Sequence, residues 1–189
     1  MILYLVGISC VGKTTIGKLL AEKIGFEFYD LDAEIEKYYD KSIERLQNEC
    51  IFINSYRKKG SIVLDKILSN TTNMVVYGVP SGLKFSYLEV FKKHKTAKDL
   101  YSIHIKDNYE NIVNRLSFFD EDSNPENIVP DEESRKKYIK SIRADYNYFR
   151  ASYKKADFCI DIDNLSLNEI PDMIIKELQN KIDIPQILI

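Results

Sequence analysis

The sequence predicts a three-layer α/β/α fold built on a five-stranded parallel sheet. Short apolar segments alternate with segments of helical periodicity, which is the pattern of parallel strands joined by helices. The first apolar segment runs directly into a glycine loop. A chain of 189 residues that is 44% hydrophobic supplies one core rather than two. We therefore expect a single domain over residues 1–189.

The expected strands are short apolar segments at residues 2–6, 26–29, 74–77, 101–105 and 158–162. The expected helices cover residues 14–24, 33–39, 50–68, 110–118, 135–154 and 166–180. In the first of these helices, Ile16, Leu20 and Ile24 recur at helical spacing, and Gly25 ends it. Ligands bind parallel sheets at the carboxyl ends of the strands, so polar residues that follow the strands are candidates for a site.

Charge is distributed unevenly in the second half of the chain. Residues 117–133 contain seven acidic residues and no Lys or Arg, whereas residues 134–155 contain eight basic residues and one acid, Asp145. This change predicts an irregular acidic lid over about 117–133, with a hinge near Ser134.

The overall composition excludes several classes of partner. The net charge is −2, which gives no reason to expect nucleic acid or an anionic membrane. No apolar run approaches the roughly 20 residues of a membrane span, and no signal peptide is visible. The three cysteines have no metal-like spacing, so we expect a reducing, cytoplasmic compartment. The apolar tail 182–189 covers the core or pairs with a second subunit, so a monomer and a homodimer both remain open.

The glycine loop satisfies the pattern Gly-x-x-x-x-Gly-Lys-Thr between a strand and a helix. Glycines let successive N–H groups point at phosphate oxygens, Lys13 places a charge on the β- and γ-phosphates, and the Thr14 hydroxyl is a ligand for Mg²⁺. The pattern predicts a P-loop NTPase fold that binds Mg·ATP. The residues expected to bind the nucleotide are Gly7, Ser9, Cys10, Val11, Gly12, Lys13, Thr14 and Thr15.

Two carboxylates follow the second strand. Asp30 and Asp32 are two residues apart, so on an extended segment both point to the same side. A carboxylate near an acceptor hydroxyl is the general base that a small-molecule kinase needs. Asp32 is equally suited to cap the helix that follows, and position alone does not decide between these roles.

With these motifs, the chain resembles shikimate kinases and their relatives. That family has the motif Phe-x-Asp-x-Asp-x-x-Ile-Glu, which Phe28, Asp30, Asp32, Ile35 and Glu36 match. The resemblance implies that Asp30 helps to hold the Mg²⁺ shell, and that Asp32 receives the hydrogen bond of the acceptor hydroxyl and acts as base. The expected catalytic residues are Lys13 and Asp32. It thus predicts a kinase that transfers the ATP γ-phosphoryl group to a small, anionic hydroxyl compound.

The resemblance also implies substrate residues with less complete matches. Tyr56-Arg57 matches the Phe-Arg of the family, whose arginine binds the acceptor carboxylate, but Gly60 stands where the family has Glu. Of the family's Gly-Gly-Gly run only Gly78 is present. Arg115 matches a family arginine beside the adenine, and Arg143 and Arg150 compete for a substrate-binding role.

These departures place shikimate itself in doubt, because Val79 and Pro80 add bulk where the family has bare glycine. Three alternatives stay open: a nucleoside or nucleotide kinase, an antibiotic phosphotransferase, and a degenerate domain that binds nucleotide without catalysis. A nucleotide kinase is disfavoured because its phosphate-bearing acceptor normally meets several arginines, and the only arginines between residues 30 and 106 are Arg45 and Arg57.

Overall fold

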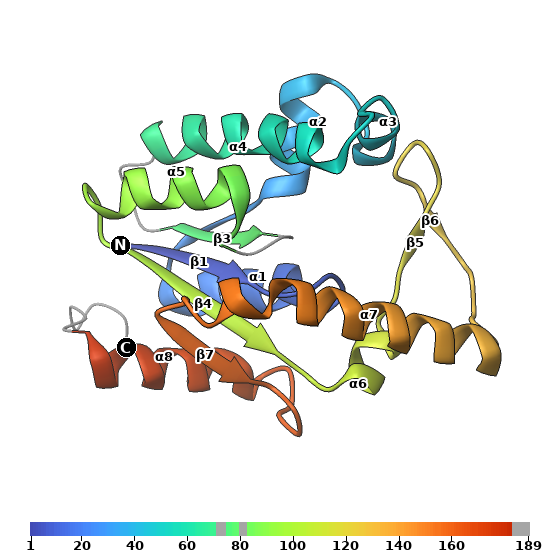
Figure 1. The fold of residues 1–189 in the computed structure, drawn as a ribbon. Helices are drawn as coiled ribbons and strands as arrows, with labels where there is room; N and C mark the ends of the chain where they lie inside the picture. Colours follow the sequence, from blue (N-terminus) through green and yellow to red (C-terminus); the bar gives the residue numbers. More distant parts are fainter. Residues whose placement is uncertain (71–74, 80–82, 183–189) are drawn as a thin grey trace.

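The computed structural model describes residues 1–70, 75–79 and 83–182. Within these ranges the main sheet has five parallel strands, as predicted (Figure 1). They are β1 (Ile2–Val6), β2 (Glu27–Asp30), β3 (Val75–Val79), β4 (Leu100–Lys106) and β7 (Phe158–Asp161). Their order across the sheet is β2-β3-β1-β4-β7. The central strand β1 is buried along its whole length, so the loop that follows it starts from the middle of the sheet.

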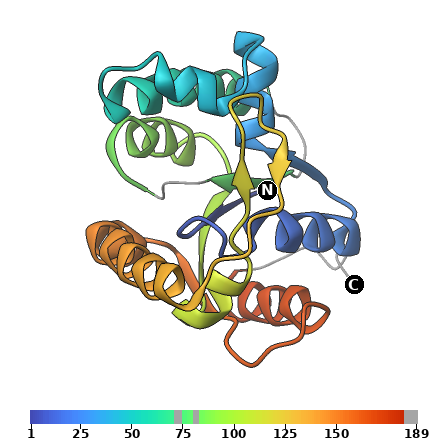
Figure 2. The ribbon, with the colours of Figure 1, turned by 90° about the vertical axis from the view of Figure 1, so that its right-hand side faces the viewer.

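Helices cover both faces of the sheet. Figure 2 shows α1 (Lys13–Ile24) and α8 (Glu169–Lys181) on one side, and α5 (Phe85–Lys95) and α7 (Glu132–Tyr153) on the other. The long helix α4 (Ile53–Asn70) packs against α5. The three-layer prediction is therefore confirmed. None of the helices in the described ranges is long and apolar enough to cross a membrane.

The helical predictions need correction. The helix expected over 50–68 is α4, which begins only at Ile53. The short helix α3 (Ile43–Asn48) was not predicted; Ser42 caps it by accepting a hydrogen bond from the Arg45 N–H. The apolar residues 51–53, which had been taken into the helix, are exposed at the start of α4. Helix α5 was not predicted, although Tyr87, Phe91 and His94 form a buried helical stripe.

The region expected to be irregular contains a short hairpin. Strands β5 (Phe118–Phe119) and β6 (Pro125–Glu126) pair antiparallel within the predicted lid, and helix α6 (Tyr109–Asn114) ends before it instead of reaching residue 118. Helix α7 starts ahead of the expected hinge because Asp131 accepts a hydrogen bond from the Ser134 N–H at 2.8 Å. The hairpin stands at the edge of the sheet toward which the strands point (Figure 1).

Candidate active site

The loop between β1 and α1 needs glycine at two positions. A Cβ on Gly7 would lie 2.6 Å from the carbonyl oxygen of Ile105 in β4, so the neighbouring strand leaves no room for a side chain. Gly12 has a φ of 101° and forms the N-cap of α1 without a side-chain hydrogen bond. The first N–H groups of α1 are therefore left for an anion.

Lys13 lies folded onto this loop. Its Nζ donates to the carbonyl oxygens of Gly7 and Ile8, at 2.9 Å each. Burial lowers the pKa of Lys13 to about 8, against the opposing effect of the nearby carboxylates, Asp32 first among them. Because pH 7 lies below this value, the side chain is a cation held at the phosphate loop.

The first of the two aspartates has a double role. Asp30 Oδ2 accepts a hydrogen bond from the Thr14 hydroxyl at 2.6 Å, and Asp30 Oδ1 accepts one from the Asp32 N–H at 3.0 Å. The latter contact makes Asp30 the N-cap of α2 (Leu31–Tyr39). The alternative that Asp32 caps the helix is therefore wrong, since the helix begins two residues earlier than expected.

The carboxylate of Asp32 is not used as a cap. The Tyr56 hydroxyl donates to its Oδ1 over a long 3.4 Å. Burial, together with the neighbouring Asp30, raises the pKa of Asp32 to about 6, while Lys13 and the Tyr56 hydrogen bond act in the opposite direction. A carboxylate with a pKa near neutrality is suited to accept a proton from a bound hydroxyl.

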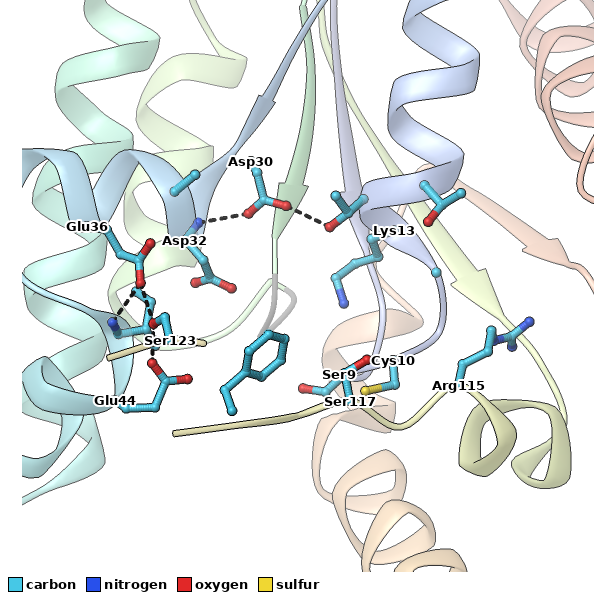
Figure 3. Close-up of a pocket in the computed structure, with 16 residues that line it drawn as sticks. Ser9, Cys10, Lys13, Asp30, Asp32, Glu36, Glu44, Arg115, Ser117 and Ser123 are labelled. Carbon is cyan, nitrogen blue, oxygen red and sulfur yellow. Dashed lines mark hydrogen bonds between the residues drawn. The ribbon is translucent and has the colours of Figure 1, made fainter. Parts of the chain in front are cut away.

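These groups line a cavity of about 730 Å³ (Figure 3). On the side of the loop, the lining residues are Ser9, Cys10, Gly12, Lys13, Thr14 and Thr15. On the other side of Asp32, they are Ala33, Glu36, Ile43, Glu44 and, from the lid hairpin, Phe119 and Ser123. Asp30, Arg115 and Ser117 complete the lining. The predicted loop residues Gly7 and Val11 are not part of it, and Val11 is buried.

Arg115 lies on the loop side of the cavity, at the end of α6. Its guanidinium forms an ion pair with the buried carboxylate of Asp107, which also accepts hydrogen bonds from the Asn108 N–H and the Asn111 side chain. These contacts fix the orientation of Arg115. Its predicted place beside the adenine of the nucleotide stays a prediction.

The other predicted arginines lie outside the cavity lining. Arg57 donates to Asn54 Oδ1 at 3.0 Å, and its guanidinium lies 5.0 Å from the ring centroid of Phe85 and 5.7 Å from that of Phe149. Arg143 lies 5.2 Å from the ring of Tyr109, and Arg150 is exposed on α7. Their expected contacts with the acceptor stay predictions.

Gly60 replaces the family's acid, and Gly78 matches the first glycine of the family's run. A Cβ on Gly60 would lie 2.2 Å from the hydroxyl oxygen of Tyr87, so Tyr87 occupies the space that a side chain at position 60 would need. Gly78 pairs with Leu5 and Asp30 in the sheet. Pro80, whose bulk was expected to hinder the acceptor, lies outside the described residues.

The tip of the lid is bonded to the segment from α2 to α3. Ser123 Oγ contacts Glu36 Oε1 at 2.7 Å and also Glu44 Oε2. In addition, the Ser42 hydroxyl donates to the Glu121 carbonyl at 2.5 Å, and Arg45 Nε lies 2.7 Å from Asp122 Oδ1. The hairpin is therefore held across the cavity by side chains of α2 and α3.

Sequence reasoning missed several of these site residues. Glu44, Phe119 and Ser123 carry no local motif, and Glu44 meets Ser123 across 79 positions of the chain. Tyr56 was noted as a family match but not as a partner of Asp32.

Comparison with known proteins points to one family. The family model for shikimate kinase matches residues 9–179. The curated shikimate kinase of Thermodesulfovibrio yellowstonii is 28% identical over 175 residues, covering 93% of each chain. The match to the shikimate kinase of Persephonella marina is local, 55% identical over 47 residues, which is 25% of this chain and 29% of that relative.

Solved structures are similar in fold. The shikimate kinase of Acinetobacter baumannii, solved in complex with shikimate, has a TM-score of 0.73 at 22% identity, covering 96% of this chain and 95% of that one. The shikimate kinase of Bacteroides thetaiotaomicron has a TM-score of 0.75 at 17% identity, covering 95% of this chain and 98% of that one.

Proposed function

Because this chain belongs to the shikimate kinase family and is an ATP-dependent small-molecule kinase of that type, we propose that its reaction takes place in the cavity between the glycine loop, Asp32 and the lid hairpin. The loop side binds ATP. The N–H groups at the start of α1 receive the phosphates, and Lys13 exchanges its two loop carbonyls for phosphate oxygens. The acceptor occupies the side beyond Asp32.

In the proposed reaction Asp32 is the general base. The acceptor hydroxyl donates a hydrogen bond to the Asp32 carboxylate. As the acceptor oxygen forms its bond to the γ-phosphorus, the hydroxyl proton passes to Asp32, and the bond between the γ-phosphorus and the bridging oxygen breaks. ADP leaves with the charge on its β-phosphate stabilised by Lys13 and the loop N–H groups. Positioning supplies much of the rate.

Thr14 and Asp30 are the residues that would hold Mg²⁺. Their hydroxyl and carboxylate oxygens lie 2.6 Å apart beside the loop, and Mg²⁺ prefers hard oxygen ligands, of which the phosphates supply others. No group of three or more His, Cys, Asp or Glu side chains suited to a metal occurs within the described ranges. When bound, Mg²⁺ would neutralise phosphate charge.

One observation carries the assignment of Asp32. Asp30 caps α2, so the Asp32 carboxylate is left to the cavity, with Lys13 on the opposite side of it (Figure 3). Asp32→Asn keeps the shape and removes the base, so turnover should fall by roughly 10²–10⁴-fold, with the ATP dissociation constant unchanged in calorimetry.

Asp40→Asn is the matched control, because Asp40 lies at the other end of the same helix and outside the cavity. Normal turnover of the Asp32 variant with a productive acceptor would show that Asp32 is not the general base.

We extend the proposal to partners and location. ATP and a small acceptor are the ligands, and no role for nucleic acid is proposed. The described cysteines Cys10, Cys50 and Cys159 are free thiols, which supports a reducing cytoplasm. Size-exclusion chromatography with light scattering distinguishes the monomer from the homodimer.

A further inference from the structure

The tip of the lid hairpin, residues 120–124, is a defined turn. Asp120 Oδ1 accepts hydrogen bonds from the Asp122 N–H at 2.8 Å and from the Asn124 N–H at 2.9 Å. Asp120 Oδ2 accepts a third hydrogen bond from the Asn124 side-chain amide at 3.0 Å. An aspartate that bonds the backbone two residues ahead fixes a turn. The three acids of this lid tip, Asp120, Glu121 and Asp122, are therefore held together as one unit.

The lid tip docks on the start of helix α3 (Figure 1). Ser42 Oγ accepts the Arg45 N–H at 3.3 Å, as the cap of α3, and donates to the Glu121 carbonyl oxygen at 2.5 Å. Arg45 Nε donates to Asp122 Oδ1 at 2.7 Å. The pKa of Arg45 is raised by Asp122 first, and then by the other two acids of the lid tip. Because Leu46 of the same helix is 1% exposed, Arg45 stands on an element that is anchored in the core.

The charge of the lid makes this contact necessary. The lid over 117–133 contains seven acidic residues and no Lys or Arg. It also lines the cavity through Ser117, Phe119 and Ser123, and the negative phosphates of ATP in that cavity would repel an acidic lid. Among the ion pairs of the described residues, the pair with Arg45 is the one that holds the lid tip. The attraction that keeps the lid in place therefore comes from a cation outside the lid.

We propose that Arg45 and the acidic lid tip form a latch that holds the hairpin closed over the cavity and opens for ligand entry and product release. Arg45 lies outside the cavity lining, so it is a positioning residue that acts through Phe119 and Ser123 of the hairpin. The latch gives a use to the acids of the lid, which the proposed reaction does not employ. This inference rests on the proposed function, since it takes the cavity as the place of the reaction.

Charge exchange at the latch tests the proposal. Arg45→Asp and Asp122→Arg each place like charges opposite one another, whereas the double variant restores an ion pair of reversed polarity. A glutamyl endopeptidase reports lid opening, because local opening of the hairpin exposes the peptide bonds after Glu121 and Glu126. Cleavage of the protein without ligands should be about three- to ten-fold faster in either single variant, the size expected when an exposed ion pair becomes a repulsion. In the double variant it should return to within about two-fold of the wild type.

A matched control separates the latch from a general effect of charge. Lys41 pairs with Glu49 instead of the lid, and both this pair and the latch pair are about half exposed. Lys41→Asp changes the net charge as Arg45→Asp does, and it should leave cleavage unchanged. Relative to this control, added salt should speed cleavage of the wild type and slow cleavage of the two single variants. The reason is that screening weakens an attraction in the first case and a repulsion in the second.

Turnover tests the positioning role. With Mg·ATP and shikimate as the acceptor probe, kcat/KM should fall about three-fold or more in both single variants and recover in the double variant. The Lys41→Asp control should turn over as the wild type does. If the wild type does not turn over shikimate, cleavage alone decides whether the latch exists.

The outcomes separate the latch from the proposed function. A double variant that is cleaved as fast as the single variants, or a Lys41→Asp variant that behaves like Arg45→Asp, overturns the latch. Faster cleavage with unchanged kcat/KM overturns the positioning role of Arg45. These results leave the role of Asp32 untouched, whereas normal turnover of Asp32→Asn would overturn the proposed function and not the latch.

Discussion

The protonation of His104 gives a quantitative test of the packing that supports β4. The imidazole is 4% exposed and lies 4.4 Å from the Tyr153 ring, nearly parallel to it at 12°. Its Nδ1 lies 3.4 Å from Cys159 Sγ. Burial, and then the charge of Lys106, lowers the pKa of His104 from 6.5 to about 4, with Asp161 opposing. The folded protein therefore keeps this ring neutral.

The sign of the pH effect follows from proton binding. Between pH 6.5 and about 4 the unfolded chain binds a proton at this position and the folded chain does not. The free energy of unfolding should therefore fall as the pH decreases through this window and be unaffected by His104 above it. The difference between the two pKa values corresponds to about 3 kcal/mol at about 1.4 kcal/mol per pKa unit.

His104→Phe keeps an aromatic ring against Tyr153 and removes the titration. Urea unfolding at pH 7.5 and pH 4.5 measures both proteins, and the wild type should lose about 2–3 kcal/mol more than the variant. Because the chain has only two histidines, NMR can follow each ring separately. Equal losses in both proteins, or a His104 midpoint above pH 6, would refute the reasoning.

Three further variants test the site. Lys13→Ala should weaken ATP binding roughly ten- to hundred-fold in calorimetry, because a charge-assisted contact to phosphate is lost, whereas the exposed Lys18→Ala on the same helix should not; equal affinity in both would remove the loop as the site. Gly60→Ala should destabilise the protein in urea unfolding by about 1–3 kcal/mol through overpacking against the Tyr87 hydroxyl, and Tyr87→Phe in the same chain should restore most of the loss. Arg57→Ala should cost about 1 kcal/mol of stability in urea unfolding through its lost ring contacts; an acceptor KM raised about ten-fold or more in the same variant would show that Arg57 also binds the acceptor, and an unchanged KM would show that it does not.

The parts of the site that could be predicted are those set by consecutive residues. The glycine loop needs glycine because β4 approaches Gly7 and because Gly12 has a positive φ, and both requirements leave a local pattern. The proximity of Asp30 and Asp32 to that loop follows from the parallel order of the strands. The sequence did not show which of the two aspartates caps α2, because Asp is a good cap at either position. The hydrogen bond from the Asp32 N–H to Asp30 decides it.

The acceptor side could not be predicted because contacts distant in sequence build it. Arg45 pairs with Asp122, which is 77 positions away in the sequence, and no local sequence pattern at either residue predicts this contact. The position of Arg57 likewise depends on Phe85, in a helix that was not predicted, and on Phe149. The expected role of Arg57 at the acceptor therefore stays a prediction.

The contact between Gly60 and Tyr87 constrains how this chain can change over generations. Any side chain at position 60 begins with a Cβ, and that atom would meet the Tyr87 hydroxyl oxygen at 2.2 Å. A mutation that restores the family's acid at position 60 is therefore damaging until position 87 has become smaller. The order of the two substitutions matters, because a change at position 87 first avoids the overpacked intermediate that a side chain at position 60 would create. Sequences that carry a large aromatic residue at position 87 should accordingly retain glycine at position 60.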